Sequence, residues 1–313
     1  MIRLEDVALA RSRLAHYLSP TPIEPAPGLG RHVWLKLENA NKTHSFKVRG
    51  ALNAMLALPA AAQAKGIVAA SSGNHAQGVA YAAALLGLDA RIVMPTGTAR
   101  RKIAGVARYG GEAILHGEIY DDAEREARRL EREGGFTYIS PYNNADVIAG
   151  GGTVGLEILD ALPEIERVIV PVGGGGLISG IALALKSLKP GIEVIGVNAA
   201  ASPDMFNLIY QTNHPLSHHT LADALPGDIE AGSLTIELTR RRVDQIVLVD
   251  EAAIAEAMRW MLAEQGWLAE GGGVVGIAAL QSGAVRADRS TAIVVSGGNV
   301  DIDVIAAILA QPR

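Results

Sequence analysis

The chain has 313 residues, of which 49% are hydrophobic and 19% charged, a globular composition long enough for two α/β domains or one large one. The net charge of −5 argues against general nucleic-acid binding, which depends on basic patches. The absence of cysteine excludes disulfide scaffolds, zinc–thiolate sites and cysteine nucleophiles. Because no signal-peptide core or convincing membrane span occurs, the sequence predicts a soluble cytoplasmic protein with no membrane partner.

Short apolar runs that predict strands alternate along the chain with helical patterns. Strands are expected at residues 33–38, 67–70, 91–95, 113–116, 137–140, 168–172, 193–197, 245–249 and 292–296. Helices are expected at 45–58, 76–87 and 99–109, and again from near Asp146 and Leu177. Because apolar strands separated by helices form parallel sheets covered on both faces, we predict an α/β protein of three-layer domains with mostly parallel sheets.

The strand–helix units between Gly66 and Asn143 are candidates for a compact small domain. We therefore assign residues 66–143 to a small domain, and residues 1–65 and 144–313 to a large domain that the chain leaves and re-enters. No Pro- or Ser-rich linker marks these borders. No segment follows the helix expected to end near Ala310, so we expect no C-terminal regulatory domain.

One lysine stands at the start of a predicted helix, within the run N-K-T-H-S-F-K-V-R-G at residues 41–50. A cation is disfavoured there, because the helix dipole attracts anions to this end. Lys47 is either an ordinary solvated lysine or an amine held neutral by its site to attack a carbonyl. The chain contains only seven lysines, so few residues compete for that role.

The run Ser71-Ser72-Gly73-Asn74-His75 lies directly after a predicted strand and before a helix. Backbone N–H groups and hydroxyls at a helix N-terminus can bind an anion such as a carboxylate. The alternative is an ordinary helix cap with turn residues. His75 is either a candidate base or a structural histidine.

Three glycine-containing runs lie at the ends of predicted elements. Gly173–Gly176 follow a buried strand and precede a helix, as in a phosphate-binding loop, but match neither the dinucleotide motif nor the Walker motif. Ser296-Gly297-Gly298-Asn299 ends a strand, either as a ligand-binding segment or as a turn with Asn299 as the helix cap. Glu270-Gly271-Gly272-Gly273 precedes a helix and is otherwise explained as a flexible loop. A lysine, an anion-binding loop, a phosphate loop and a strand-end hydroxyl together suit a phosphorylated aldehyde cofactor.

In their order along nearly the whole chain, these motifs resemble those of the fold-type II pyridoxal-phosphate enzymes. The resemblance is to the serine/threonine dehydratase and serine racemase branch. It implies a tryptophan synthase β-like fold with two three-layer domains. It is carried by TPIEP, KLEN, THSFKVRGALNA, SSGNHAQG, VIAGGGT, PVGGGGLISGIA, LADAL, AEGGGVVGIAA and SGGNVD.

The resemblance implies a role for each cofactor-binding residue. Lys47 would form the Schiff base with pyridoxal 5'-phosphate and remove the α-proton of the substrate. The other residues implied to bind the cofactor are Phe46 on one face of the ring, Asn74 on the phenolic oxygen, Gly173, Gly174, Gly175 and Gly176 on the phosphate, Ser296 on the pyridine nitrogen, and Glu270 nearby.

The resemblance also implies substrate-binding residues. Ser71, Asn74 and His75 would lie in the loop that takes the substrate carboxylate. Ser72 would be the second acid/base residue, on the far face, which racemases of this branch use.

Four positions depart from the family pattern. His44 stands where the family usually has Gly, and Gly151 where many members have Gln, and both are expected to reshape the substrate pocket. Ala224 replaces a frequent glycine near the ring and is likewise expected to reshape the substrate pocket. Asn198 replaces a glutamate that binds a divalent cation in some members, so we assign no metal ligand.

The implied function is elimination of water from a β-hydroxy amino acid, giving a 2-oxo acid and ammonia. The substrate could be L-threonine, L-serine or a bulkier analogue such as phenylserine. An amino-acid racemase is the alternative, because Ser72 is present. A β-replacement synthase is disfavoured by Val48-Arg49, and a non-catalytic cofactor-binding module by the joint presence of Lys47, the glycine loop and Ser296. The family also implies a homodimer.

Overall fold

The computed structural model describes residues 2–217 and 219–310, except for the side chain of Arg101. The chain forms two compact units. The first comprises the residues up to Leu18 together with Lys47–Gly151, and the second comprises Ser19–Phe46 together with the chain from Gly152 onward. Each unit contains one sheet.

In the structure, the helix that starts at Lys47 belongs to the unit with the smaller sheet. The sequence had assigned this helix to the large domain, residues 1–65 and 144–313, and only residues 66–143 to the small domain. The physical reason is close helix packing. Helix α2 (Lys47–Ala57) lies along α4 (Asn74–Leu85), and α1 (Leu4–Leu14) lies against α2. A Cβ on Gly78 would come within 3.1 Å of the backbone carbonyl carbon of Lys47, so the two helices approach at a glycine.

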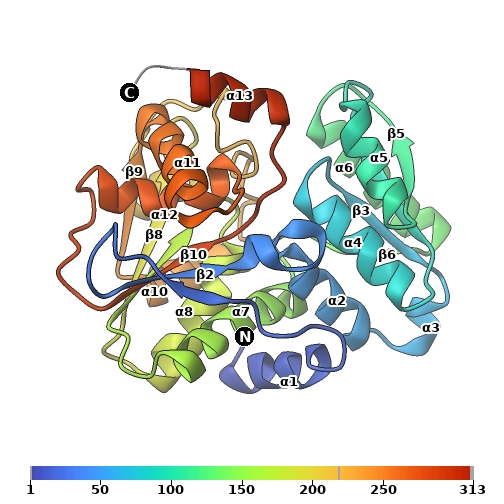
Figure 1. Cartoon of the computed structure of the whole chain (residues 1–313). Helices are drawn as coiled ribbons and strands as arrows, with labels where there is room; N and C mark the ends of the chain where they lie inside the picture. Colours follow the sequence, from blue (N-terminus) through green and yellow to red (C-terminus); the bar gives the residue numbers. More distant parts are fainter. Residues whose placement is uncertain (1, 218, 311–313) are drawn as a thin grey trace. The chain divides into compact units, whose positions relative to one another are not determined.

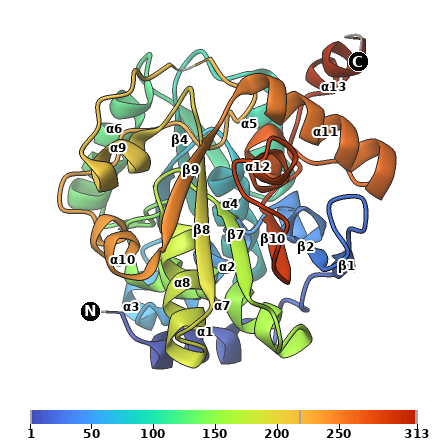
Figure 2. The ribbon, with the colours of Figure 1, turned by 90° about the vertical axis from the view of Figure 1, so that its left-hand side faces the viewer.

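The sheet of the second unit has six strands in the order β1-β2-β10-β7-β8-β9. Figure 2 shows β9, β8, β7 and β10 side by side in this order. All neighbouring pairs are parallel except β1 with β2. The strands are β1 (Ile23–Pro25), β2 (Val33–Leu37), β7 (Arg167–Pro171), β8 (Glu193–Ala199), β9 (Gln245–Val249) and β10 (Thr291–Val295).

Alternating side chains of this sheet enter two different cores. Ile169 and Ile293 belong to the core on one face, and their neighbours Val168 and Ala292 to the core on the other. The first face is covered by α11 (Glu251–Gln265), α12 (Gly271–Gln281) and α13 (Ile302–Ala310). The second is covered by α8 (Gly176–Leu188), α9 (Asp204–Tyr210) and the later part of α7 (Ala145–Ala161), with α10 (Leu234–Arg242) packed on α8. The prediction of a three-layer domain is confirmed for this unit.

The sheet of the first unit has four parallel strands in the order β5-β4-β3-β6. They are β3 (Ile67–Ala70), β4 (Ala90–Met94), β5 (Glu112–Leu115) and β6 (Thr137–Tyr138). One face packs on α2, α4 and α5 (Arg100–Arg108), and the other on α6 (Tyr120–Gly134). Figure 1 shows α4, α5 and α6 around these strands, so this unit also has three layers.

Three short or polar elements were not expected from the sequence. They are α1, α3 (Ala60–Gln63) and β1, the strand that makes the only antiparallel pairing named above. β1 has three residues and ends in a proline, so it carries too short a pattern to be recognised. Within residues 2–217 and 219–310, no helix is both long enough and apolar enough to cross a bilayer.

Candidate active site

Two of the predicted ligand-binding runs follow neighbouring parallel strands of the six-stranded sheet. Gly173–Gly176 follow β7, and Ser296 follows β10. Ligands of α/β sheets gather outside the carboxyl ends of the strands. The second unit therefore brings the predicted phosphate loop and the predicted ring-nitrogen partner to the same edge of one sheet.

At two positions of the phosphate loop, Gly173 and Gly175, there is no room for a side chain. A Cβ on Gly173 would lie 2.6 Å from the carbonyl oxygen of Leu225, and one on Gly175 would lie 2.6 Å from Met205. Gly175 is also left-handed, with φ of 84°, and is the N-cap of α8 without a side-chain capping bond. The loop thus presents backbone N–H groups at a helix N-terminus, which suits a phosphate group.

Ser296 lies in a segment that pairs with the residues before the predicted catalytic lysine. The N–H of Phe46 donates to the carbonyl of Ser296 at 3.1 Å, and Ser45 forms an antiparallel bridge with Gly297. Ser296 is buried, while Phe46 is half-buried and packs on the core beside α8. The structure therefore brings Phe46 and Ser296 together by main-chain bonding.

Lys47 follows Phe46 in the chain and is the first residue of α2. The prediction put Ser45 near the helix start, but Ser45 is fully extended, with φ of −163°, because it pairs with Gly297. The amine of Lys47 donates a hydrogen bond to the carbonyl of Pro141 at 2.9 Å. The side chain is half-buried, so the amine is oriented by the segment that follows β6.

The predicted carboxylate loop is an open helix N-terminus. Gly73 is the N-cap of α4 without a side-chain capping bond, and the hydroxyl of Ser71 accepts from the N–H of Gly73 at 3.2 Å. Ser71 and Ser72 are half-buried, and Asn74 is buried as the first residue of the helix. Because its N-cap is a glycine, this helix N-terminus has no capping side chain of its own, which suits an anion site.

His75 is buried among apolar groups within the first unit. Its Nε2 lies 2.9 Å from the carbonyl oxygen of Ile139. Burial lowers the pKa of His75 to about 3, with a further lowering from the charge of Lys47, although the bond to Ile139 acts in the opposite direction. The imidazole is therefore neutral near pH 7 and donates from Nε2. A base with so low a pKa is poorly matched to proton removal near neutral pH, which favours the structural interpretation of His75.

Two of the three residues predicted to reshape the substrate pocket, His44 and Gly151, differ in backbone conformation and burial. His44 is exposed and left-handed, with φ of 54°, a conformation that suits the glycine usual in the family. Gly151 is buried within α7. Its neighbour Gly150 is explained by packing, since a Cβ there would lie 2.6 Å from the carbonyl oxygen of Arg49.

Glu270 is buried and is the N-cap of α12. Its carboxylate accepts from the N–H of Asn299 at 3.1 Å, and its own N–H donates to the carbonyl of Gly297 at 3.1 Å. The glycines after it are not a flexible loop. A Cβ on Gly271 would lie 2.1 Å from the carbonyl oxygen of Leu221, and one on Gly273 would lie 2.4 Å from that of Gly297.

Asn198 replaces the metal-binding glutamate of some family members and uses both ends of its amide inside the protein. It donates to the carbonyl of Val172 at 2.7 Å and accepts from the N–H of Phe206 at 3.1 Å. Val172 directly precedes the phosphate loop, so Asn198 supports that loop from behind. Among the residues that the structure describes, no group of three His, Asp or Glu side chains could hold a metal ion.

Two partly buried polar contacts in these segments were not predicted from the sequence. The amide of Asn299 donates to the carbonyl of Thr43 at 2.8 Å. Lys36 is fully buried, and its amine donates to Glu157 at 2.6 Å. These residues stand in runs that carry the family resemblance, but no local pattern indicates their partners, which are more than 100 positions away.

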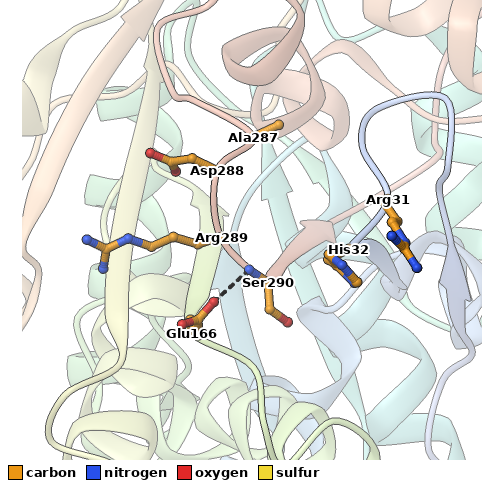
Figure 3. Close-up of a pocket in the computed structure, with 7 residues that line it drawn as sticks. All are labelled: Arg31, His32, Glu166, Ala287, Asp288, Arg289 and Ser290. Carbon is orange, nitrogen blue, oxygen red and sulfur yellow. Dashed lines mark hydrogen bonds between the residues drawn. The ribbon is translucent and has the colours of Figure 1, made fainter.

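A separate cavity of about 360 Å³ lies in the second unit at the opposite ends of the strands (Figure 3). Arg31 and His32 precede β2, Glu166 precedes β7 and Ser290 precedes β10. In Figure 3 the side chain of Arg289 points away from Arg31 and His32, and Glu166 is engaged by the N–H of Ser290 at 2.9 Å. No predicted site residue lines this cavity.

Comparison with known proteins gives a consistent result. The family model described as "pyridoxal-phosphate dependent enzyme" matches residues 14–297. The chain is 41% identical to an L-threonine ammonia-lyase of Thermotoga maritima over 99% of this chain and 78% of that protein. It is 38% identical to the catabolic L-threonine dehydratase TdcB of Escherichia coli over 98% and 96% of the two chains. The structure of maize serine racemase is similar with a TM-score of 0.91, at 34% identity, over 98% and 97% of the chains.

Proposed function

The chain belongs to the family of pyridoxal-phosphate-dependent enzymes, and we propose that it is a lyase that removes water from L-threonine or L-serine. The released enamine becomes an imine, which water hydrolyses to a 2-oxo acid and ammonia. The observation that carries the proposal is the glycine loop at the start of α8. This loop follows β7, and the neighbouring strand β10 leads directly into Ser296. The carbonyl of Ser296 accepts a hydrogen bond from Phe46, the residue before Lys47.

The residues of the chain fit the cofactor. Gly173 and Gly175 cannot take a side chain without collision, and the loop offers N–H groups suited to the cofactor phosphate. Ser296 would face the pyridine nitrogen, and Asn74 would hydrogen-bond to the phenolic oxygen. Phe46 would pack on one face of the ring, and Glu270 would lie near the cofactor. When bound, pyridoxal phosphate supplies an electron sink for the pair left on Cα as the α-proton departs.

Lys47 has two tasks in this proposal. Its amine holds the cofactor in the resting enzyme and, once released, removes the α-proton. The bond from its amine to the carbonyl of Pro141 supports this, because it gives the free amine a fixed direction. Neutral His75 adds no positive charge beside the amine near pH 7.

Ser296 favours elimination over transamination. A serine hydroxyl does not hold a full proton on the ring nitrogen as an aspartate would, so it limits how far charge is drawn into the ring. The N-terminus of α4 would receive the substrate carboxylate, with Ser71, Asn74 and His75 in that loop.

A racemase of the same fold is the second candidate. The similarity to maize serine racemase and the presence of half-buried Ser72 in the carboxylate loop support it. The two activities are separated by incubating the protein with L-serine and L-threonine and measuring 2-oxo acid against the opposite enantiomer. An excess of the enantiomer that Ser72→Ala removes would identify a racemase, whereas an excess of 2-oxo acid supports the lyase.

The finer proposal concerns a substrate bulkier than threonine. A non-glycine residue in the left-handed region costs about 1–2 kcal/mol, so the imidazole of His44 is retained at a backbone cost. Gly151 removes the long polar side chain that the family pattern has there. Each methylene that fills a pocket contributes about 1–3 kcal/mol, so serine and threonine would be poorer substrates without being excluded.

The test of this finer proposal is kcat/KM for serine, threonine and threo-phenylserine in the native enzyme and in Gly151→Gln. We expect the bulky substrate to lead in the native enzyme and to lose its lead in the variant. A tenfold preference for threonine that the substitution leaves unchanged refutes it. A cytoplasmic homodimer belongs to the same proposal, and light scattering tests its oligomeric state.

A further inference from the structure

The segment that leads into Lys47 is paired along its length with the segment after β10. The N–H of Phe46 donates to Ser296, Ser45 bridges Gly297, and the N–H of Gly298 donates to the carbonyl of His44 at 2.9 Å. The last contact comes from a side chain, because the amide of Asn299 donates to the carbonyl of Thr43 at 2.8 Å. Residues 43–46 and 296–299, all of the second unit, therefore run antiparallel to each other.

This pairing holds a strained turn. Thr43 and His44 are consecutive residues in the left-handed region, with φ of 58° and 54°. Apart from glycines, the described residues contain one other, Gln211. The left-handed conformation is unfavourable for L side chains, and especially for a β-branched one such as Thr43. The turn therefore depends on contacts that oppose its return to a relaxed conformation.

Asn299 supplies a side-chain contact of this kind. Its position is fixed in turn, since its backbone N–H donates to the buried carboxylate of Glu270 at 3.1 Å. Asn299 is not the cap of the following helix, which the sequence left as an alternative, because α13 begins three residues later at Ile302. Neither its position nor its bonds are explained by helix capping.

We propose that Asn299, held by Glu270, is a positioning residue for Lys47. Its amide keeps Thr43 and His44 in the left-handed conformation, and the turn fixes Phe46, to which Lys47 is joined by one peptide bond. Without the amide, the turn relaxes and the point from which the lysine side chain departs becomes variable. This inference rests on the proposed role of Lys47 as the residue that binds the cofactor.

The experiment measures how fast Lys47 captures its cofactor, independently of turnover. Cofactor-free protein is mixed with pyridoxal phosphate, quenched with borohydride at set times and digested, and pyridoxylated Lys47 is quantified by mass spectrometry. We expect Asn299→Ala to slow capture roughly three- to tenfold, the effect of losing one hydrogen bond. Asn299→Asp, which keeps the size but cannot donate, should behave alike and serves if the alanine variant does not fold.

Rescue by glycine tests the strain directly. Glycine adopts positive φ freely, so Thr43→Gly in the Asn299→Ala background should restore capture to within about twofold of the native rate. Thr43→Ala is the matched control, because it removes the same γ atoms but keeps the Cβ, and it should not rescue. Asn207→Ala removes another amide that donates to a main-chain carbonyl, that of His214 at 2.9 Å, and should leave the rate unchanged.

The outcomes separate two failures. If the native protein is not modified at Lys47, the proposed function fails. If it is modified, but both Asn299 variants capture at the native rate, or alanine at position 43 rescues as well as glycine, the positioning role of Asn299 is wrong.

Discussion

Helices α8 and α4 each follow a parallel strand and begin with a glycine as the N-cap, but they differ in what lies behind that glycine. At the start of α8, a Cβ on Gly173 or Gly175 would meet Leu225 or Met205 at 2.6 Å. At the start of α4, a Cβ on Gly73 would meet no atom within 4 Å. The first loop is shaped by packing and suits a resident group, whereas the second borders open space and suits a ligand that enters and leaves.

The largest loss of activity is expected from substitution of Lys47, because neither the α8 loop nor the α4 loop supplies another amine. Lys47→Ala leaves both helix N-termini intact, so phosphate and carboxylate binding should persist while turnover falls by about 10³-fold or more. The visible absorbance of the Schiff base between Lys47 and the cofactor should also disappear. Spectra and 2-oxo acid release check this, and a variant that remains yellow after dialysis with full activity contradicts the assignment.

The next effect tests the comparison itself. Gly175→Ala introduces a left-handed alanine that collides with Met205, at a cost of about 1–3 kcal/mol, so cofactor affinity should fall roughly tenfold to a hundredfold. Gly73→Ala, the matched control, should leave cofactor affinity within about twofold, because its Cβ enters open space. Titration of cofactor-free protein with pyridoxal phosphate measures both, and equal losses would remove the distinction between the loops.

A smaller effect concerns the buried histidine next to the α4 loop. The pKa of His75 is about 3 in the folded chain against an ordinary value of 6.5, so between these values the unfolded chain binds more protons. Stability therefore falls as pH falls from 6.5 toward 3, by up to about 1.4 kcal/mol per pH unit from this group, and the effect vanishes above that window.

Denaturant unfolding across this window checks that slope. His75→Gln keeps a donor for Ile139 but cannot take up a proton, so its stability should depend less steeply on pH. Parallel curves for the native protein and His75→Gln would contradict the assignment of a buried neutral imidazole.

The smallest effect is expected from removing divalent ions. Asn198 supports the phosphate loop through Val172 with a neutral amide, where some family members bind a cation through a glutamate. Losing that negative charge weakens attraction for a cation. EDTA should therefore leave kcat within about twofold. Loss of activity that Mg²⁺ restores would show that a cation acts at another position.

Local patterns identified most of the elements that carry the site. The apolar runs at 67–70 and 245–249 coincide with β3 and β9, and the glycines after residue 172 lie where a phosphate loop was expected. The start of α2 was placed two residues too early. Ser45 is extended because it pairs with Gly297, and a bond to a residue so far along the chain leaves no trace in a local pattern.

The sequence by itself determined the alternation of strands and helices, the glycine- and serine-containing loops at strand ends, and the family of the chain. These depend on the periodicity of apolar side chains and on the order of the motifs. Only the tertiary structure decided why particular glycines are required. Gly271 and Gly273 approach the carbonyls of Leu221 and Gly297, a packing constraint that looks like flexibility in the sequence. It also decided that Asn299 holds Thr43 and that His75 is neutral, since partners and burial depend on segments that meet only in the folded chain.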